Sequence, residues 1–197
     1  MELTERVTQE TRDATSVLVL RPQLQAGSDA TCKRLLVGDS RPVHLLGICF
    51  STSPTQWYDQ WEQVLGGPPA DAAVITTPDS FVDDKPDGLV VETVGNPADV
   101  TGIGMQATKY LNSWEKDDAT VVVALDSLTL MLQYVSLETL YRFLHVLTRR
   151  LDVLGATGLF FLDPSAQDQK TVNTLKTLFH GVLSYEEQAG DWQLRTQ

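Results

Sequence analysis

The 197-residue chain is poor in basic residues and in cysteine, and it has no long hydrophobic run. Fifteen Lys and Arg stand against 26 Asp and Glu, which gives a formal net charge of −11. This charge repels the phosphates of nucleic acids and anionic membrane surfaces. The densest basic point is the pair Arg149-Arg150, so neither nucleic acid nor membrane is an expected partner. No apolar stretch approaches the roughly 20 residues that span a bilayer.

The two cysteines, Cys32 and Cys49, lack the paired spacing of a metal site, so both are expected to be reduced thiols. The opening segment 1–15 is polar and is predicted to be helical, and it lacks the apolar core of a secretion signal. These features predict a soluble cytoplasmic protein with one domain over 1–197. The acidic composition is also typical of proteins from a salt-rich cytoplasm.

Short apolar runs alternate with amphipathic segments along the chain. The runs expected to form strands are 16–20, 43–50, 72–76, 88–94, 120–126 and 155–163. Because these runs are continuous rather than alternating, they favour strands covered on both faces, as in a parallel sheet. Helical patterns lie between them at 28–37, 53–65, 98–114 and 136–155. The order predicts a three-layer α/β fold with a mostly parallel sheet, and segment 181–197 predicts a C-terminal antiparallel hairpin at the sheet edge.

Helix boundaries can be predicted from capping residues. Ser53 and Pro54 mark the start of one helix, and Ser28 or Asp29 can cap the first. Segment 136–155 begins with a serine, ends with a glycine, and carries six leucines spaced three and four apart. That stripe could form a coiled-coil seam, but it is short for one, so packing on the sheet is favoured.

The run "VVVALD" ends on Asp126, as strands of P-loop ATPases present an acid to magnesium. Such proteins also need a phosphate-binding turn, G-x-x-x-x-G-K-[ST], after the first strand. The chain has "GSDATCKR" there: Gly27 and Lys33 keep the spacing, but Cys32 replaces the second glycine and Arg34 replaces the magnesium-binding hydroxyl. A Cβ at residue 32 crowds the phosphate, and a guanidinium cannot bind a metal cation.

From the first strand to about residue 187 the sequence resembles the RecA/KaiC-like ATPase superfamily, and it looks closest to KaiC-like proteins of halophilic archaea. The resemblance rests on "VVVALDSLTLMLQYVSLETLYRFLHVLTRRL" and "GATGLFFLDPSAQDQKTVNTLKTLF". It implies that Asp126 is the magnesium-assisting acid and that a carboxylate after the second strand activates water. Ser51 and Thr52 occupy that place here, and a neutral hydroxyl cannot act as the general base.

Simpler interpretations stand beside these. Asp126 and Asp163 could each only end a strand and hold the following turn. Trp57 and Trp61 share one helix face, where core packing is the default and a partner-binding anchor is the alternative. The histidines are scattered and show no metal spacing; they are His44, His145 and His180.

The favoured function is a catalytically inactive RecA/KaiC-like module that acts through protein–protein interaction, in a regulatory or signalling setting. It would need no metal and no cofactor. Its vestigial nucleotide site would comprise Gly27, Cys32, Lys33, Arg34, Ser51, Thr52 and Asp126. Within it, Arg34 is predicted to pair with Asp126 in place of magnesium, directly or through one water, and Lys33 is the alternative partner.

Two other functions remain open. An ATP-binding switch would use Lys33, with ATP and magnesium as ligands and without efficient hydrolysis, and a true enzyme would have its site elsewhere along the sheet edge. The sequence does not identify the protein partner. A homodimer through the terminal hairpin or an exposed helix is a further expectation.

Overall fold

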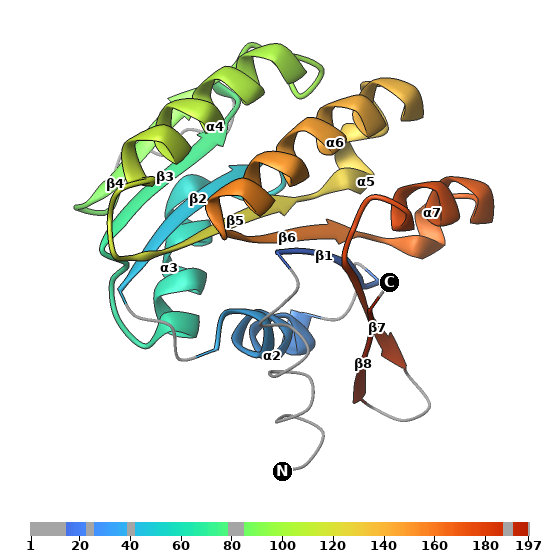
Figure 1. Ribbon diagram of the computed structural model, residues 1–197, viewed down its shortest axis with the longest axis horizontal. Coiled ribbons are helices and arrows are strands. Elements are labelled where there is room, and N and C mark those ends of the chain that lie inside the picture. Colours follow the sequence, from blue (N-terminus) through green and yellow to red (C-terminus); the bar gives the residue numbers. More distant parts are fainter. Residues whose placement is uncertain (1–14, 23–25, 39–41, 79–84, 187–190, 197) are drawn as a thin grey trace.

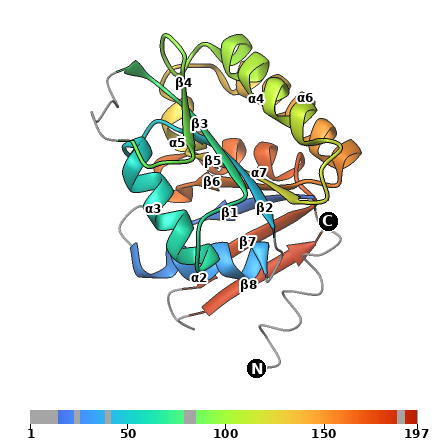
Figure 2. The same ribbon diagram turned by 90° about the vertical axis from the view of Figure 1, so that its left-hand side faces the viewer.

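The computed structural model describes residues 15–22, 26–38, 42–78, 85–186 and 191–196. Its centre is an eight-stranded sheet in the order β4-β3-β2-β5-β6-β1-β7-β8 (Figures 1 and 2). The strands are β1 (Ser16–Leu20), β2 (Val43–Cys49), β3 (Asp71–Thr76), β4 (Leu89–Thr93), β5 (Thr120–Asp126), β6 (Thr157–Leu162), β7 (Gly181–Glu186) and β8 (Asp191–Thr196). Neighbours pair in parallel except for the antiparallel β7–β8. The predicted mostly parallel α/β fold with a terminal hairpin is confirmed.

Helices cover both faces of the sheet, as predicted (Figure 1). One face carries α2 (Ala26–Val37) and α3 (Pro54–Leu65). The other carries α4 (Val100–Trp114), α5 (Leu128–Met131), α6 (Leu137–Leu154) and α7 (Gln169–Lys176). Two hydrophobic cores result, one on each side of strands whose residues are almost all buried. No helix of the described segments is long and apolar enough to cross a membrane.

Capping residues set the ends of α3 and α6 where the sequence predicted them. The Ser53 and Ser136 hydroxyls accept hydrogen bonds from backbone amides three residues later, each at 3.2 Å. Gly66 and Gly155 end these helices with φ of 69° and 63°, a left-handed conformation that suits glycine.

The buried faces of these helices settle two alternatives. Four leucines of α6 pack into the core, so the stripe packs on the sheet rather than forming a coiled coil; they are Leu140, Leu144, Leu147 and Leu151. Trp57 and Trp61 are 2% and 0% exposed in the core beside α3. The core interpretation of both tryptophans is therefore confirmed.

Some elements differ from the sequence prediction. Helix α2 begins at Ala26, two residues before the predicted start, while α5 and α7 were not predicted. Helix α7 is capped by Asp168, whose carboxylate accepts from the Thr171 amide at 2.7 Å. The predicted helix over 1–15 lies outside the described residues apart from Thr15, and so do the side chains of Ser28 and Asp29.

Candidate functional site

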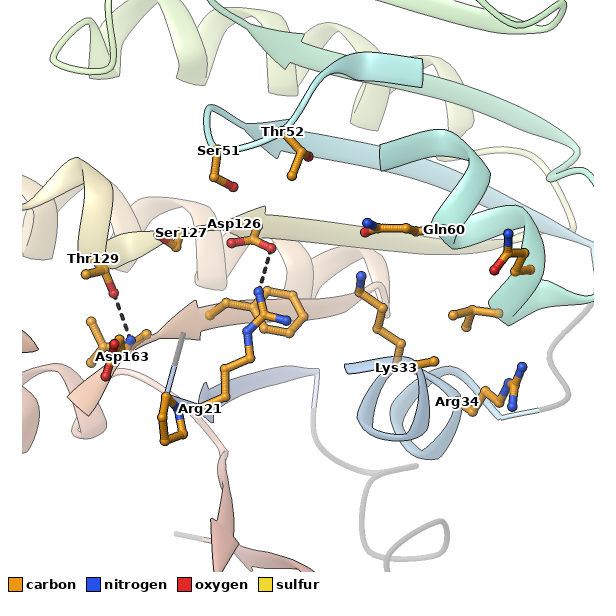
Figure 3. A pocket seen from close by; sticks show the side chains of 16 residues that line it. Arg21, Lys33, Arg34, Ser51, Thr52, Gln60, Asp126, Ser127, Thr129 and Asp163 are labelled. Carbon is orange, nitrogen blue, oxygen red and sulfur yellow. Dashed lines mark hydrogen bonds and ion pairs between the residues drawn. The ribbon is translucent and has the colours of Figure 1, made fainter. Parts of the chain in front are cut away.

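A pocket of about 390 Å³ opens where the carboxyl ends of β1, β2, β5 and β6 meet helices α2 and α3 (Figure 3). It receives Arg21 from the end of β1, Lys33 from α2, and Asp126 from the end of β5. Ser51 and Thr52 enter it from the loop after β2. In parallel α/β sheets this edge is where ligands bind, so the pocket is the candidate functional site.

Asp126, the last residue of β5, forms an ion pair inside the pocket. Its Oδ2 accepts a hydrogen bond from Nη2 of Arg21 at 2.8 Å. The two side chains are only 18% and 20% exposed, so the pair is mostly screened from water. The guanidinium carbon also lies 4.7 Å from the centroid of the Phe161 ring on β6. The acid that the resemblance assigns to magnesium is therefore neutralised by an arginine of the same chain.

The prediction that Arg34 pairs with Asp126 is wrong. Helix α2 runs unbroken from Ala26, which places Arg34 in its third turn rather than its first. Successive helical residues are rotated by roughly 100°, so Arg34 diverges from its buried neighbour Lys33 and is exposed. It lines the pocket at the end far from Asp126 and points away from it (Figure 3). Arg21 follows β1 directly and supplies the guanidinium instead.

The segment predicted as a phosphate-binding turn is helical. Gly27 lies in the first turn of α2, and Cys32 is fully buried in the core below that helix. The amides of Cys32, Lys33 and Arg34 lie inside the helix, where each bonds the carbonyl four residues earlier rather than a ligand. The spacing of Gly27 and Lys33 thus does not build a phosphate cradle.

Lys33 lies between two aromatic rings and is 3% exposed. Its Nζ is 5.0 Å from the centroid of the Trp61 ring and 5.8 Å from that of Phe161. Such cation–π contacts stabilise a desolvated ammonium by about 2 kcal/mol or more. The side chain points into the pocket (Figure 3), so this cation faces the same space as Arg21.

The loop after β2 brings hydroxyls, not a carboxylate, beside Asp126. Cys49 is in register with Asp126, so Ser51 and Thr52 lie just beyond the acid, as the sequence predicted. Ser51 is exposed, while Oγ1 of Thr52 lies 3.2 Å from Sγ of Cys49. The hydroxyl of neither residue can take a proton from water at neutral pH.

Asp163 is the second carboxylate in the pocket lining. Its Oδ1 accepts hydrogen bonds from the Ser165 amide at 2.9 Å and from the Ser165 hydroxyl at 2.6 Å. It thereby caps the short 3₁₀ helix Pro164–Ala166. Its own amide donates to the Thr129 hydroxyl at 2.8 Å. These bonds confirm the interpretation of Asp163 as a residue that ends a strand and holds a turn.

Metal-binding side chains do not gather in the described part of the chain, where no group of three or more His, Cys, Asp or Glu could hold an ion. The histidines lie apart: His44 is 3.0 Å from Asp117, and His180 is 3.6 Å from Asp152. His145 is exposed on α6. None of these three histidines lines the pocket at the carboxyl edge of the sheet.

Sequence reasoning missed several residues of the pocket. The lining residues that were not predicted as site residues include Arg21, Gln60, Gln63 and Phe161. One available signal was position: Arg21 follows β1 as Ser51 follows β2, so both leave the sheet at the carboxyl edge. The two glutamines line the pocket from α3, whose tryptophans are buried in the core.

The strand order and the position of Asp126 define a RecA-like, P-loop-type α/β fold, and known structures share it. Protein PH0250 of Pyrococcus horikoshii OT3 aligns with a TM-score of 0.61 at 10% identity, over 98% of this chain and 92% of that one. Protein PH0321 of the same species, solved in complex with an unknown peptide, aligns at 0.57 and 13%, over 92% and 83%. An ATPase of a bacterial type III secretion system aligns at 0.51 and 10%, over 88% and 51%.

Sequence comparison places the chain in a family. The chain belongs to DUF7504, a family of unknown function, whose model matches residues 14–185. A search of curated proteins found no match. The predicted RecA-like fold is confirmed by the sheet topology and by the structural alignments, not by this family.

Proposed function

We propose that the chain is a catalytically inactive RecA-like module that acts by binding another protein, in a regulatory or signalling role. One observation carries this proposal: the Asp126 carboxylate is bound by the Arg21 guanidinium at 2.8 Å. A magnesium ion would have to displace this arginine and would be repelled by its charge. The finer resemblance, to KaiC-like proteins of halophilic archaea with a degenerate P-loop, and the cytoplasmic setting belong to the same proposal.

Two further features support the loss of catalysis. The segment that should cradle phosphate is helical from Ala26, and the second glycine is replaced by the buried Cys32. The loop after β2 presents Ser51 and Thr52 where active relatives would carry the base. Neither nucleic acid nor membrane suits a chain of charge −11, so a protein is the expected partner. PH0321, which shares the fold, was solved with a peptide bound.

A second candidate is an ATP-binding switch without efficient hydrolysis. The pocket supports this second candidate, because Lys33 and Arg21 both face a volume of about 390 Å³ at the ligand-binding edge of the sheet. ATP would have to draw Arg21 from Asp126 or bind beside the pair. Magnesium would accompany it as the second ligand. The two candidates therefore differ in whether nucleotide binds at all.

Calorimetric titration with ATP and magnesium separates the candidates. The inactive module is expected to give no binding heat at millimolar ATP and no release of phosphate above that of buffer. Binding with a micromolar Kd would favour the switch, and efficient turnover would contradict both candidates. Asp126→Asn is the matched control, because any turnover that depends on a magnesium-assisting acid must fall when that carboxylate is removed.

A further inference from the structure

A groove of about 800 Å³ runs along the outer surface between α4 and α6, on the face of the molecule away from α2 and α3. The two helices lie side by side in both views (Figures 1 and 2) and contact each other. Its α4 wall is a stripe from Val100 to Asn112, with residues four apart on successive turns. Its α6 wall runs from Thr139 to Val146. At 1.5 Å per residue, the α4 stripe is about 18 Å long, or about three helical turns.

The groove is lined by apolar side chains that remain in contact with water. Met105 is 70% exposed and Val146 is 68% exposed, and both line it beside the partly buried Phe143. They are two of the five large hydrophobic residues that are exposed in the described part of the chain. Burying such side chains against a partner is favourable by roughly 25 cal/mol per Å² of apolar surface.

Gly104 keeps the middle of the groove open. It lies in the interior of α4, where glycine is a weak helix former. A Cβ at this position would find its nearest neighbour, Cε2 of Phe143, at 3.8 Å, an ordinary contact. The packing of α4 on α6 therefore does not require glycine. A larger side chain at residue 104 would fill the groove that glycine leaves empty.

The charge of the lining is opposite to that of the whole protein. Among the lining residues are two cations, Lys109 and Arg142, and no carboxylate, in a chain of net charge −11. Lys109 bonds Glu92 of β4 at 2.7 Å, and Arg142 bonds Glu138 at 2.5 Å on the preceding turn of α6. Each cation is more than 60% exposed, and each ion pair needs only one of its N–H groups. Both cations keep further N–H donors for a second carboxylate.

We propose that this groove binds an amphipathic helix of a partner protein whose apolar stripe is flanked by Asp or Glu. The apolar floor would receive residues spaced i, i+3 or i+4, and i+7, as in other helix-in-groove complexes. Lys109 and Arg142 would contact the flanking carboxylates and select against basic helices. This inference rests on the proposed function, because it names the surface and the kind of partner.

The test uses the full chain and two labelled synthetic peptides of about 16 residues, roughly four helical turns. Both carry the same leucine stripe, and they differ only in having Glu or Lys on its flanks. Fluorescence anisotropy should show that the Glu peptide binds at least about tenfold tighter than the Lys peptide. Gly104→Met should weaken the Glu peptide by at least about tenfold, and joint Lys109→Glu and Arg142→Glu substitutions should reverse the preference.

Val153 provides a matched control. It is 74% exposed on the same helix as Val146 but lies outside the groove. Val146→Glu should abolish peptide binding and Val153→Glu should leave it unchanged, while circular dichroism confirms that both variants fold. Equal effects of these two substitutions, equal affinity for the two peptides, or no binding at about 1 mM would overturn the proposal.

Sedimentation distinguishes a partner helix in the groove from a second copy of this chain. A dimer in sedimentation that Val146→Glu dissociates would show that a second copy is the occupant, and the proposal would be wrong. Failure of the proposed function has a different signature, because ATP turnover would contradict that function whatever the peptides do. If the peptides do not bind and the protein does not turn over ATP, only the proposal for the groove is wrong.

Discussion

Replacing Arg21 by methionine is expected to lower the free energy of unfolding by about 2–4 kcal/mol. Breaking a buried ion pair costs roughly 3–5 kcal/mol, because it leaves one charge without compensation, whereas an exposed pair contributes about 0–1 kcal/mol. Arg21 is 20% exposed and Asp126 is 18% exposed, so the cost should lie between the exposed and the fully buried cases, at about 2–4 kcal/mol. Methionine keeps apolar contact with Phe161, which restricts the loss mainly to charge and hydrogen bonding.

Urea unfolding followed by circular dichroism measures this loss. Arg34→Met is the matched control, since it makes the same chemical change on the exposed face of α2. A surface substitution of this kind should change the free energy of unfolding by no more than about 0.5 kcal/mol. If Arg21→Met costs no more than Arg34→Met, the pair does not stabilise the pocket.

A double-mutant cycle assigns the loss to the pair itself. Asp126→Asn removes the charge of the other partner and keeps the shape of the side chain. The coupling energy between Arg21→Met and Asp126→Asn should be at least about 1 kcal/mol, as for residues in direct contact. Additive effects within about 0.3 kcal/mol would refute the ion pair as the source of the stability.

Three further predictions concern other parts of the protein. The hydrogen bond from Lys109 lowers the pKa of Glu92. The ionised Glu92 therefore stabilises the fold above about pH 4.3, and this stabilisation is lost as pH falls through the folded pKa. Glu92→Gln should flatten the decline of the urea midpoint in acid, and an unchanged decline would contradict this. Gly47→Ala should destabilise the fold by about 1–3 kcal/mol, because the new Cβ would lie 2.7 Å from Cε2 of Trp57. Gly104→Ala should stabilise the fold by about 0.5–1 kcal/mol, because alanine is the better helix former and its Cβ has room. Urea unfolding that ranks the two variants the other way would refute this account of the packing at the two glycines. The melting temperature should rise with potassium chloride as salt screens the charge of −11, and a flat profile would argue against self-repulsion.

The sequence predicted most of the fold because its signals are local. Continuous apolar runs mark buried parallel strands, and Ser53, Ser136 and Gly155 mark helix ends through hydrogen bonds within one turn. Helix α7 was missed because its eight residues give only two buried positions, Val172 and Leu175, which is too short for a clear period.

The candidate site was predicted only in part. Asp126, Ser51 and Thr52 meet because β2 and β5 are parallel neighbours, whose carboxyl ends lie at the same edge of the sheet. The partner of Asp126 depends on which strands are neighbours and on where α2 begins. Segment 26–34 contains no proline that would break the helix. Helix α2 therefore continues through the residues where the P-loop motif would place a phosphate-binding turn. Arg34 therefore faces outward, and Arg21 forms the ion pair with Asp126 that was predicted for Arg34.

The strand order explains how Arg21 reaches Asp126. Strand β6 lies between β1 and β5, so Arg21 must cross β6 to reach Asp126, and Phe161 of β6 lies under its guanidinium. Lys33 approaches the same ring from α2. A bound polyphosphate would compete with Asp126 for Arg21 and would leave that carboxylate uncompensated in a mostly buried place. This competition is the physical reason to expect partner binding at the α4–α6 groove instead. There the exposed cations can bind a second carboxylate without leaving a buried charge uncompensated.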